Sequence, residues 1–333
     1  MSKDSKEAKA MKKAMKKKVT MRESFKIYMQ NTSKKKLAKK IAIGIILYLV
    51  LFDLAFVFIY PFLTMILDAF KSDADLLNST VKWIPTQLTF VNFKLAYSEL
   101  HYLDYLKNSL ITCAVATFGH AIVCSFIGYG FARYKFRGKG VLFAGVILSM
   151  LVPTQVIVFP LYQMYASAGF LDTYLPILVP CFFGFGLRGA FYIFLFRQFF
   201  MGLPYEMEEA ARIDGCGPLR TYIKIMLPMS RSSLLVCAVL SVVWHWNESF
   251  EQSIYLNSAP QLQLLTAKIP DMYEKLAQFS EEAVEGVNAA DLVINQGTVM
   301  AATFLVILPL LIIYMFVQKQ FMEGVERSGL TGM

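Results

Sequence analysis

Six long apolar stretches, each with at most two Asp, Glu, Lys or Arg residues, run along this chain of 333 residues. A helix that crosses a bilayer needs about 20 predominantly apolar residues, because its backbone groups must all be satisfied internally. We place the spans at residues 41–66, 108–132, 140–162, 173–197, 232–254 and 293–318. The fifth is the least regular, since Glu248 and Glu251 interrupt its second half. The pattern predicts an all-α membrane protein with six transmembrane helices.

Proline falls inside the third, fourth and sixth of these spans, where it removes a backbone donor and bends a helix. The positions are Pro153 and Pro160 in the third span, Pro176 and Pro180 in the fourth, and Pro309 in the sixth. Such kinks occur in transporters and equally as static packing features, so they do not decide between these classes.

The segments between the spans differ in charge, and this difference predicts their sides of the membrane. Lys and Arg are enriched in a basic tail (1–40), in the short loop 133–139 and in the segment that follows the fourth span. The positive-inside rule puts these segments in the cytoplasm. Both termini, including the C-terminal tail 321–333, are then cytoplasmic. The segments 67–107, 163–172 and 255–292 are extracytoplasmic, and residues 108–320 form a core domain with spans two to six.

Composition agrees with a polytopic membrane protein rather than a globular enzyme, because 56% of the residues are hydrophobic. The net charge of +9 belongs to the tail: residues 1–40 hold 15 Lys and Arg against three acids, and the other 293 residues sum to −3. We interpret the tail as a cytoplasmic retention signal that also touches anionic lipid. Nucleic-acid binding and a cleaved signal peptide are the alternatives. Few aromatic residues disfavour the first, and the long apolar run after Lys40 disfavours the second.

A polar, helix-forming stretch at 204–228 lies between the fourth and fifth spans. Pro204 suits a first helical turn, and the acids that follow it complement the positive end of the helix dipole. Glu208 and Arg212 are four residues apart and can pair. Gly215 suits a left-handed cap, and Pro218 starts a second short helix. The pattern predicts a rigid helical hairpin on the cytoplasmic side. An amphipathic hairpin lying on the bilayer is the alternative.

The residues Glu209-Ala210-Ala211, Asp214-Gly215 and Leu227-Pro228 closely resemble the EAA loop of permease subunits in binding-protein-dependent ABC importers. The resemblance implies a type I importer permease architecture. It also implies that the loop is a coupling helix that docks into a cleft on an ATPase subunit. Its residues assigned to coupling are Glu209, Ala210, Ala211, Asp214 and Gly215.

Flanking segments extend the resemblance over residues 85–332 and favour the smaller maltose-permease-type subunit, which handles sugars and some polyols. They are Asn108-Ser109-Leu110, the segment 128–138, Val152-Pro153 through Tyr162, the turn 169–174, Trp246-Asn247-Glu248-Ser249-Phe250, and the segment 321–332. Two positions depart from the family pattern: Gly128 and Gly130 stand where Ala is common. Phe250 also comes one place late.

The family implies further subunits: a second homologous permease, an ATPase dimer that binds ATP-Mg, and an extracytoplasmic solute-binding protein. It also implies a prokaryotic plasma membrane. The chain itself has no nucleotide-binding Gly-x-x-x-x-Gly-Lys-[Ser/Thr] segment, so we expect no cofactor in it. Its three histidines, His101, His120 and His245, look scattered, and its five cysteines show no paired spacing. We therefore expect no metal, no catalytic residue and no enzyme.

Two groups of polar residues within the spans are candidates for transport. Asp53 and Arg188 lie near mid-depth, where a lone charge is costly, so we expect each to have a partner. They pair with each other or with a partner permease, or they form a packing ion pair with no transport role. Candidates for lining the pathway are Asn108, Trp246, Asn247 and Glu248. For Trp246 the alternative is an interfacial anchor.

The sequence therefore predicts a non-catalytic subunit that forms half of the pathway of an ATP-driven sugar importer. An ATP-independent secondary transporter and an importer permease for a non-sugar solute remain as alternatives.

Overall fold

The computed structural model describes residues 34–284 and 294–330, and the described residues are mostly helical, with no strand among them. Three parts of the sequence predictions lie outside the described residues. They are most of the basic tail, the final part of the segment predicted to be extracytoplasmic (285–292), and residues 331–333.

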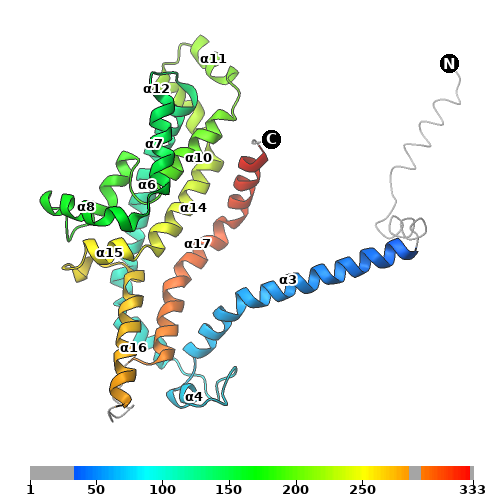
Figure 1. The fold of residues 1–333 in the computed structure, drawn as a ribbon, viewed down its shortest axis with the longest axis vertical. Coiled ribbons are helices and arrows are strands. Elements are labelled where there is room, and N and C mark those ends of the chain that lie inside the picture. The colour runs from blue at the N-terminus through cyan, green and yellow to red at the C-terminus, as the bar shows by residue number, and fades with distance from the viewer. Residues whose placement is uncertain (1–33, 285–293, 331–333) are drawn as a thin grey trace. The chain divides into compact units, whose positions relative to one another are not determined.

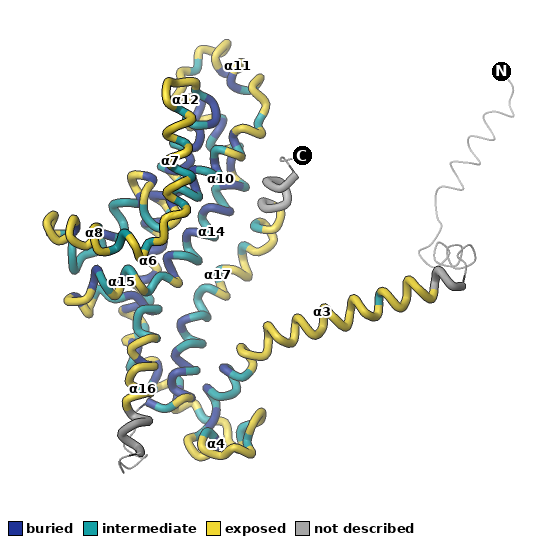
Figure 2. The backbone as a smooth tube through the Cα atoms, in the orientation of Figure 1, coloured by how far each residue is buried: buried dark blue, intermediate teal, exposed yellow. Residues whose placement is uncertain are grey.

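Two compact units make up the chain, residues 1–64 and residues 65–333 (Figure 1). The described part of the first unit belongs to α3 (Lys34–Ala69), a helix that contains the predicted span 41–66. Its side chains from residue 38 to residue 63 are almost all exposed, and they are mainly Ile, Leu, Val and Phe (Figure 2). Such an apolar surface along a helix of this length suits hydrocarbon.

Three described helices are long and apolar enough to cross a membrane, and each matches a predicted span. They are α3, α6 (Tyr102–Arg133) and α17 (Gln296–Leu330), which correspond to the predicted spans 41–66, 108–132 and 293–318. Two pairs of shorter helices are also apolar and long enough when each pair is taken together, but both pairs are sharply bent. The count of six transmembrane helices therefore stays a prediction.

The third predicted span, 140–162, is broken rather than straight. Its two parts, α7 (Lys139–Leu151) and α8 (Thr154–Ser167), meet at an angle of 103°. Pro153 stands at the break, and Val152 before it has extended backbone (φ −76°, ψ 118°). A proline disfavours helical backbone in the residue that precedes it, so the chain turns here instead of bending gently.

The fourth predicted span, 173–197, is also not one helix. It begins with the short α9 (Leu175–Leu178) and the 3₁₀ turn η1 (Val179–Phe183). Three left-handed residues follow, Gly184, Gly186 and Arg188, and only then does α10 (Gly189–Met201) begin. With 13 residues, α10 is about 20 Å long, shorter than a hydrocarbon core. The prolines and glycines of this stretch therefore break the helix that hydropathy alone suggests.

The fifth predicted span, 232–254, ends early as a helix. α14 (Arg231–Asn247) stops where Glu248 adopts extended backbone (φ −77°, ψ 107°), and the short α15 (Phe250–Tyr255) follows. The acids that made this span irregular in the sequence therefore lie beyond the end of the long helix.

The centre of the second unit is α6, which packs against α10 and α14, while α14 packs in turn against α17. The close approach of α6 and α10 depends on Gly128. A Cβ atom at this position would lie 2.7 Å from the Cβ of Phe196 and 2.9 Å from the backbone nitrogen of Arg197. A methyl group does not fit there, so the glycine sets how closely the two helices approach.

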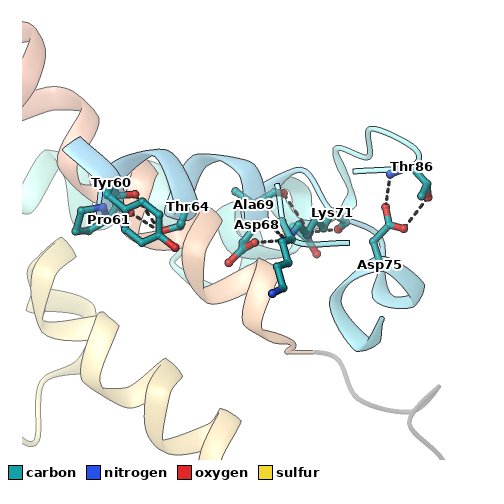
Figure 3. Close-up of polar contacts among 10 residues, drawn as sticks. Tyr60, Pro61, Thr64, Asp68, Ala69, Lys71, Asp75 and Thr86 are labelled. Carbon is teal, nitrogen blue, oxygen red and sulfur yellow. Dashed lines mark hydrogen bonds and ion pairs between the residues drawn. The ribbon is translucent and has the colours of Figure 1, made fainter. Parts of the chain in front are cut away.

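Hydrogen bonds organise the segment that joins α3 to α6, which includes α4 (Asp73–Leu77) and α5 (Val91–Glu99). The Asp75 carboxylate accepts from the backbone N–H (2.8 Å) and the hydroxyl (2.6 Å) of Thr86 (Figure 3). The hydrogen bond from the Thr86 side chain holds the pKa of Asp75 below its usual range. Asn92 donates to the carbonyls of Ala69 (3.1 Å) and Lys71 (2.8 Å), so this segment is folded rather than an open loop.

The elements after α15 are two short 3₁₀ turns, η3 (Pro260–Leu262) and η4 (Leu265–Ala267), and α16 (Lys268–Val284). α16 packs against α17 and lies at the opposite end of the second unit from α11 (Glu206–Ile213) (Figure 1).

Replacing Gly128 with alanine is expected to destabilise the second unit by about 1–3 kcal/mol, because the new methyl group overpacks the contact between α6 and α10. The measurement is the thermal unfolding midpoint of the purified chain in detergent. Gly130→Ala is the matched control, since a Cβ at that position meets no atom within 4 Å. Equal midpoints for the two variants would show that the helices approach less closely than described.

Candidate functional site

The stretch 204–228 contains two short helices joined by a turn. α11 is followed by a tight turn and by α12 (Pro218–Thr221). Gly215 in the turn is left-handed (φ +77°), its N–H donates to the Arg212 carbonyl (3.0 Å), and the Cys216 N–H donates to the Ala211 carbonyl (2.9 Å). These two bonds form a Schellman motif, which ends a helix and reverses the chain. The left-handed cap predicted at Gly215 is confirmed.

The second arm of the hairpin leads into α14 across a break at Ser230, where the chain bends by 75°. After α12 comes one turn of π-helix, η2 (Tyr222–Met226), and then α13 (Leu227–Met229). The Tyr222 hydroxyl lies 2.7 Å from the Ser125 hydroxyl of α6. The second arm is therefore held to the central helix before it joins α14.

α11 has one buried face and one exposed face (Figure 2). Glu208 and Ala211 are buried. The exposed stripe consists of Glu206, Glu209, Ala210 and Ile213, at helical spacing. The Ile213 side chain is 86% exposed, so the stripe ends in an apolar residue that is open to solvent or to a partner.

A buried ion pair fixes this hairpin to α6. The Arg133 Nε lies 3.1 Å from a carboxylate oxygen of Glu208, and both side chains are almost completely buried. Arg133 also donates from Nη2 to the Leu203 carbonyl (2.7 Å), and its guanidinium lies 4.3 Å from the ring centre of Tyr205. One arginine at the end of α6 therefore holds the start of the hairpin through three contacts.

The pair that the sequence predicted, Glu208 with Arg212, is present but is weaker. Its shortest distance is 3.9 Å, and the Arg212 side chain is 67% exposed. The four-residue spacing along one helix predicted the pair of Glu208 with Arg212. Arg133 is 75 residues before Glu208, so local spacing could not predict that pair. Among the predicted coupling residues, Glu209, Ala210, Asp214 and Gly215 are exposed, and Ala211 faces inward.

A cavity of about 610 Å³ opens in the second unit, next to the breaks in the third, fourth and fifth predicted spans. Residues from α7, α8, η1, α10, α14 and α15 line it. Its polar and charged lining includes Gln155, Arg188, His245, Glu248, Glu251 and Gln252, and its aromatic lining includes Tyr165, Phe191, Trp244 and Tyr255. Polar groups beside aromatic rings can bind a polyhydroxylated solute by hydrogen bonds and stacking.

Of the four residues predicted to line a pathway, only Glu248 borders this cavity. Its carboxylate also accepts from the Glu251 N–H (3.0 Å). Asn108 donates to the Gln261 (2.9 Å) and Gln263 (3.1 Å) carbonyls.

The two residues before Glu248 face elsewhere. Trp246 is buried and donates from its indole to the Val306 carbonyl on α17 (3.1 Å). Asn247 is exposed and donates to the Val243 carbonyl of its own helix (2.8 Å). These contacts are structural, and the described cavity does not include either side chain.

The two predicted intramembrane charges have different surroundings. Arg188 borders the cavity, and its guanidinium lies 5.4 Å from the ring centre of Trp244. Asp53 is exposed on α3, in the first unit. Their mutual pairing stays a prediction.

Two histidines that looked scattered in the sequence lie together in the fold. The ring centres of His120 and His245 are 5.3 Å apart, and Cys181 lies beside them. They come from α6, η1 and α14, so only the packing of three elements unites them.

Comparisons with known proteins identify the family. The family model described as "Binding-protein-dependent transport system inner membrane component" matches residues 109–327, which is more than half of the chain. The chain therefore belongs to this family, as the resemblance of its motifs predicted. Together with its long apolar helices, this makes it a multi-pass membrane protein.

Similar proteins cover most of the chain. The arabinooligosaccharides transport system permease protein AraQ of Halalkalibacterium halodurans is 27% identical, over 84% of this chain and 93% of the relative. The diacetylchitobiose uptake system permease protein DasC of Streptomyces coelicolor is 26% identical, over 82% and 92% respectively.

A solved structure has the same fold. It is a chain in the crystal structure of a bacterial ABC transporter involved in the import of the acidic polysaccharide alginate. The likeness has a TM-score of 0.69 at 21% identity and covers 87% of this chain and 99% of that chain.

Removing one partner of the buried ion pair is expected to loosen the hairpin. Glu208→Gln leaves the charge of Arg133 buried without a counter-charge, and Arg133→Gln does the same to the charge of Glu208. Either variant is expected to lower the stability of the hairpin by about 3–5 kcal/mol. Hydrogen exchange of the amides in 203–217 measures this loss as faster opening of α11. Arg212→Gln is the matched control and is expected to cost less than about 1 kcal/mol, because that arginine is exposed.

The double variant Arg133→Leu with Glu208→Leu tests the cause. Because no buried charge then remains, protection of the hairpin is expected to recover in part. Exchange in Arg133→Gln that matches the wild type would contradict the role given to this pair.

Proposed function

We propose that this chain is a permease subunit of an ATP-binding-cassette importer for a sugar or oligosaccharide, and that it forms half of the translocation pathway. The observation that carries the proposal is the exposed stripe of α11, which holds Glu209 and Ala210 on a hairpin fixed rigidly to α6. In this proposal the stripe seats in a cleft of an ATPase subunit.

Rigid mounting is what a coupling element needs. Closure of an ATPase dimer on binding ATP-Mg would displace α11, and a loosely attached hairpin would absorb this movement. The Arg133–Glu208 pair transmits the displacement to α6, and the second arm transmits it through η2 and α13 to α14. Both helices pack around the region where the cavity lies, so movement of the hairpin changes access to it.

The remaining assembly follows from the proposal. A second, homologous permease completes the pathway, two ATPase subunits bind ATP-Mg, and a solute-binding protein delivers the solute from outside. The hairpin and both termini face the cytoplasm of a prokaryotic cell. The basic loop 133–139, with four Lys and Arg and no acid, supports this orientation.

A sugar is the favoured solute for two reasons. The printed names of AraQ and DasC refer to arabinooligosaccharides and diacetylchitobiose, both carbohydrates. The cavity also combines amide and carboxylate side chains with aromatic rings such as Trp244 and Tyr255, the groups that bind hydroxyls and sugar faces. The chain itself is proposed to be non-catalytic, with ATP hydrolysis left to the partner.

Charge reversal on the exposed stripe tests the coupling. Glu209→Arg is expected to weaken docking of the ATPase by about 2 kcal/mol or more, roughly thirty-fold, as for a central residue of an interface. ATP-driven sugar uptake by the reconstituted complex in proteoliposomes is expected to fall accordingly, while the amount of chain in the membrane is unchanged.

Glu274→Arg, an equally exposed charge reversal on α16, is the matched control and is expected to transport normally. Wild-type uptake by Glu209→Arg would refute the coupling role. Uptake by this chain alone, without ATP, would instead identify a secondary transporter.

Two neighbouring residues test the cavity as the solute's path. Glu248→Gln keeps the acceptor for the Glu251 N–H but removes the charge, and is expected to raise the apparent KM for sugar about tenfold. Asn247→Ala changes a residue outside the cavity and is expected to leave the KM unchanged. The measurement is the concentration dependence of uptake with saturating ATP. An effect of Asn247→Ala alone would place the path on another face of α14.

A further inference from the structure

We propose that His120, Cys181 and His245 form a binding site for a Zn²⁺ ion. One ligand atom from each residue lies within 4.8 Å of the other two, and all three residues are buried, with exposed fractions of 0%, 0% and 3%. Two imidazoles and a thiolate are ligands that zinc prefers in proteins. Each ligand comes from a different element, α6, η1 and α14 respectively.

Ser241 orients both imidazole rings. The Nδ1 of His245 lies 2.9 Å from the Ser241 backbone carbonyl, which can only accept, so this nitrogen carries the hydrogen. The Nε2 of neutral His245 therefore has its lone pair free, and it lies 3.8 Å from the Cys181 sulfur. The Ser241 hydroxyl lies 3.4 Å from Nδ1 of His120 as well. Outer hydrogen bonds of this kind fix the tautomer of metal-binding histidines.

One of the three pairs of ligand atoms already has nearly the spacing of a bound site. Bond lengths of about 2.0–2.1 Å to nitrogen and 2.3 Å to sulfur put tetrahedral N and S ligands about 3.6 Å apart. The observed 3.8 Å between His245 and Cys181 nearly meets this value. The Nε2 of His120 is buried and makes no hydrogen bond of normal geometry, although buried polar atoms are normally satisfied. A metal ion would satisfy it once the ligand atoms, which lie within 4.8 Å of one another, close to bonding distance.

Two glycines leave space around the cluster. A Cβ on Gly186 would lie 3.1 Å from the Cys181 sulfur, and a Cβ on Gly189 would lie 3.7 Å from Nε2 of His120. An ion can reach the cluster through the cavity, because His245 lines its wall. Zinc binding breaks the Cys181 S–H bond, which now points to the Ile177 carbonyl (3.2 Å), and releases the proton to water.

The consequence for transport rests on the proposed function. A bound ion would tie η1 to α6 and α14, the two helices that receive the movement of the hairpin. Opening and closing of the pathway requires elements of this kind to move relative to one another. Zinc is therefore expected to hold the permease in one state and to inhibit uptake, and Cys181→Ser is expected to relieve this inhibition.

The test uses Co²⁺ as a spectroscopic substitute for zinc on the complex that contains the full chain, purified in nanodiscs. We expect one Co²⁺ per chain with a thiolate-to-cobalt charge-transfer band, and displacement of Co²⁺ by Zn²⁺. Cys181→Ser and, separately, His120→Gln are expected to abolish the band. Cys113→Ser is the matched control, since Cys113 is an equally buried thiol of α6 outside the cluster.

Absence of Co²⁺ binding, or a band that survives in Cys181→Ser, would overturn the site. A folding defect is monitored by the thermal unfolding midpoint, and the two single variants provide independent routes to the same answer. Metal binding is measured without transport. A complex that binds zinc but shows no ATP-driven uptake even after the metal is removed by a chelator would therefore contradict the proposed function and leave the metal site standing.

Discussion

The buried contact between Arg133 and Glu208 determines how the hairpin is positioned on α6. Burying two charges is costly, and an apolar pair of similar size would often be as stable. Unlike an apolar pair, however, a guanidinium that also contacts the Leu203 carbonyl and the Tyr205 ring accepts only a narrow range of helix positions. The ion pair therefore gives α11 a defined position relative to α6. The exposed stripe lies on α11, so its position is fixed as well.

The breaks in the apolar segments lie next to the cavity. Straight helices in the third, fourth and fifth predicted spans would pack along their whole length. Instead, the chain turns at Pro153, leaves helical backbone between Gly184 and Arg188, and ends α14 at Asn247. Polar side chains next to each break border one cavity. Irregular backbone at membrane depth is tolerated where it lines such a cavity.

The sequence predicted the elements that depend on neighbouring residues in the chain. Apolar runs located α3, α6 and α17, and the positions of Pro204, Gly215 and Pro218 predicted the hairpin and its left-handed cap. Contacts between distant residues left no such pattern, which is why the Arg133–Glu208 pair and the gathering of His120, Cys181 and His245 were missed. The break before α10 had a signal, Gly184-Phe185-Gly186-Leu187-Arg188-Gly189, but uniform hydropathy concealed it. Trp246 was predicted as a candidate for lining the pathway, but its indole donates a hydrogen bond to α17 and does not face the cavity.

The single π-helical turn at Tyr222–Met226 has a consequence for the chain's tolerance of length changes. A turn of this type holds one residue more than an α-helical turn between the same flanking elements. Deleting one residue within it would yield continuous α-helix and leave the flanking buried positions in phase. The same deletion within α14 would rotate every later side chain by about 100° and turn Trp246 out of the core. Related chains that differ by one residue between the hairpin and the cavity can therefore absorb the difference at this turn.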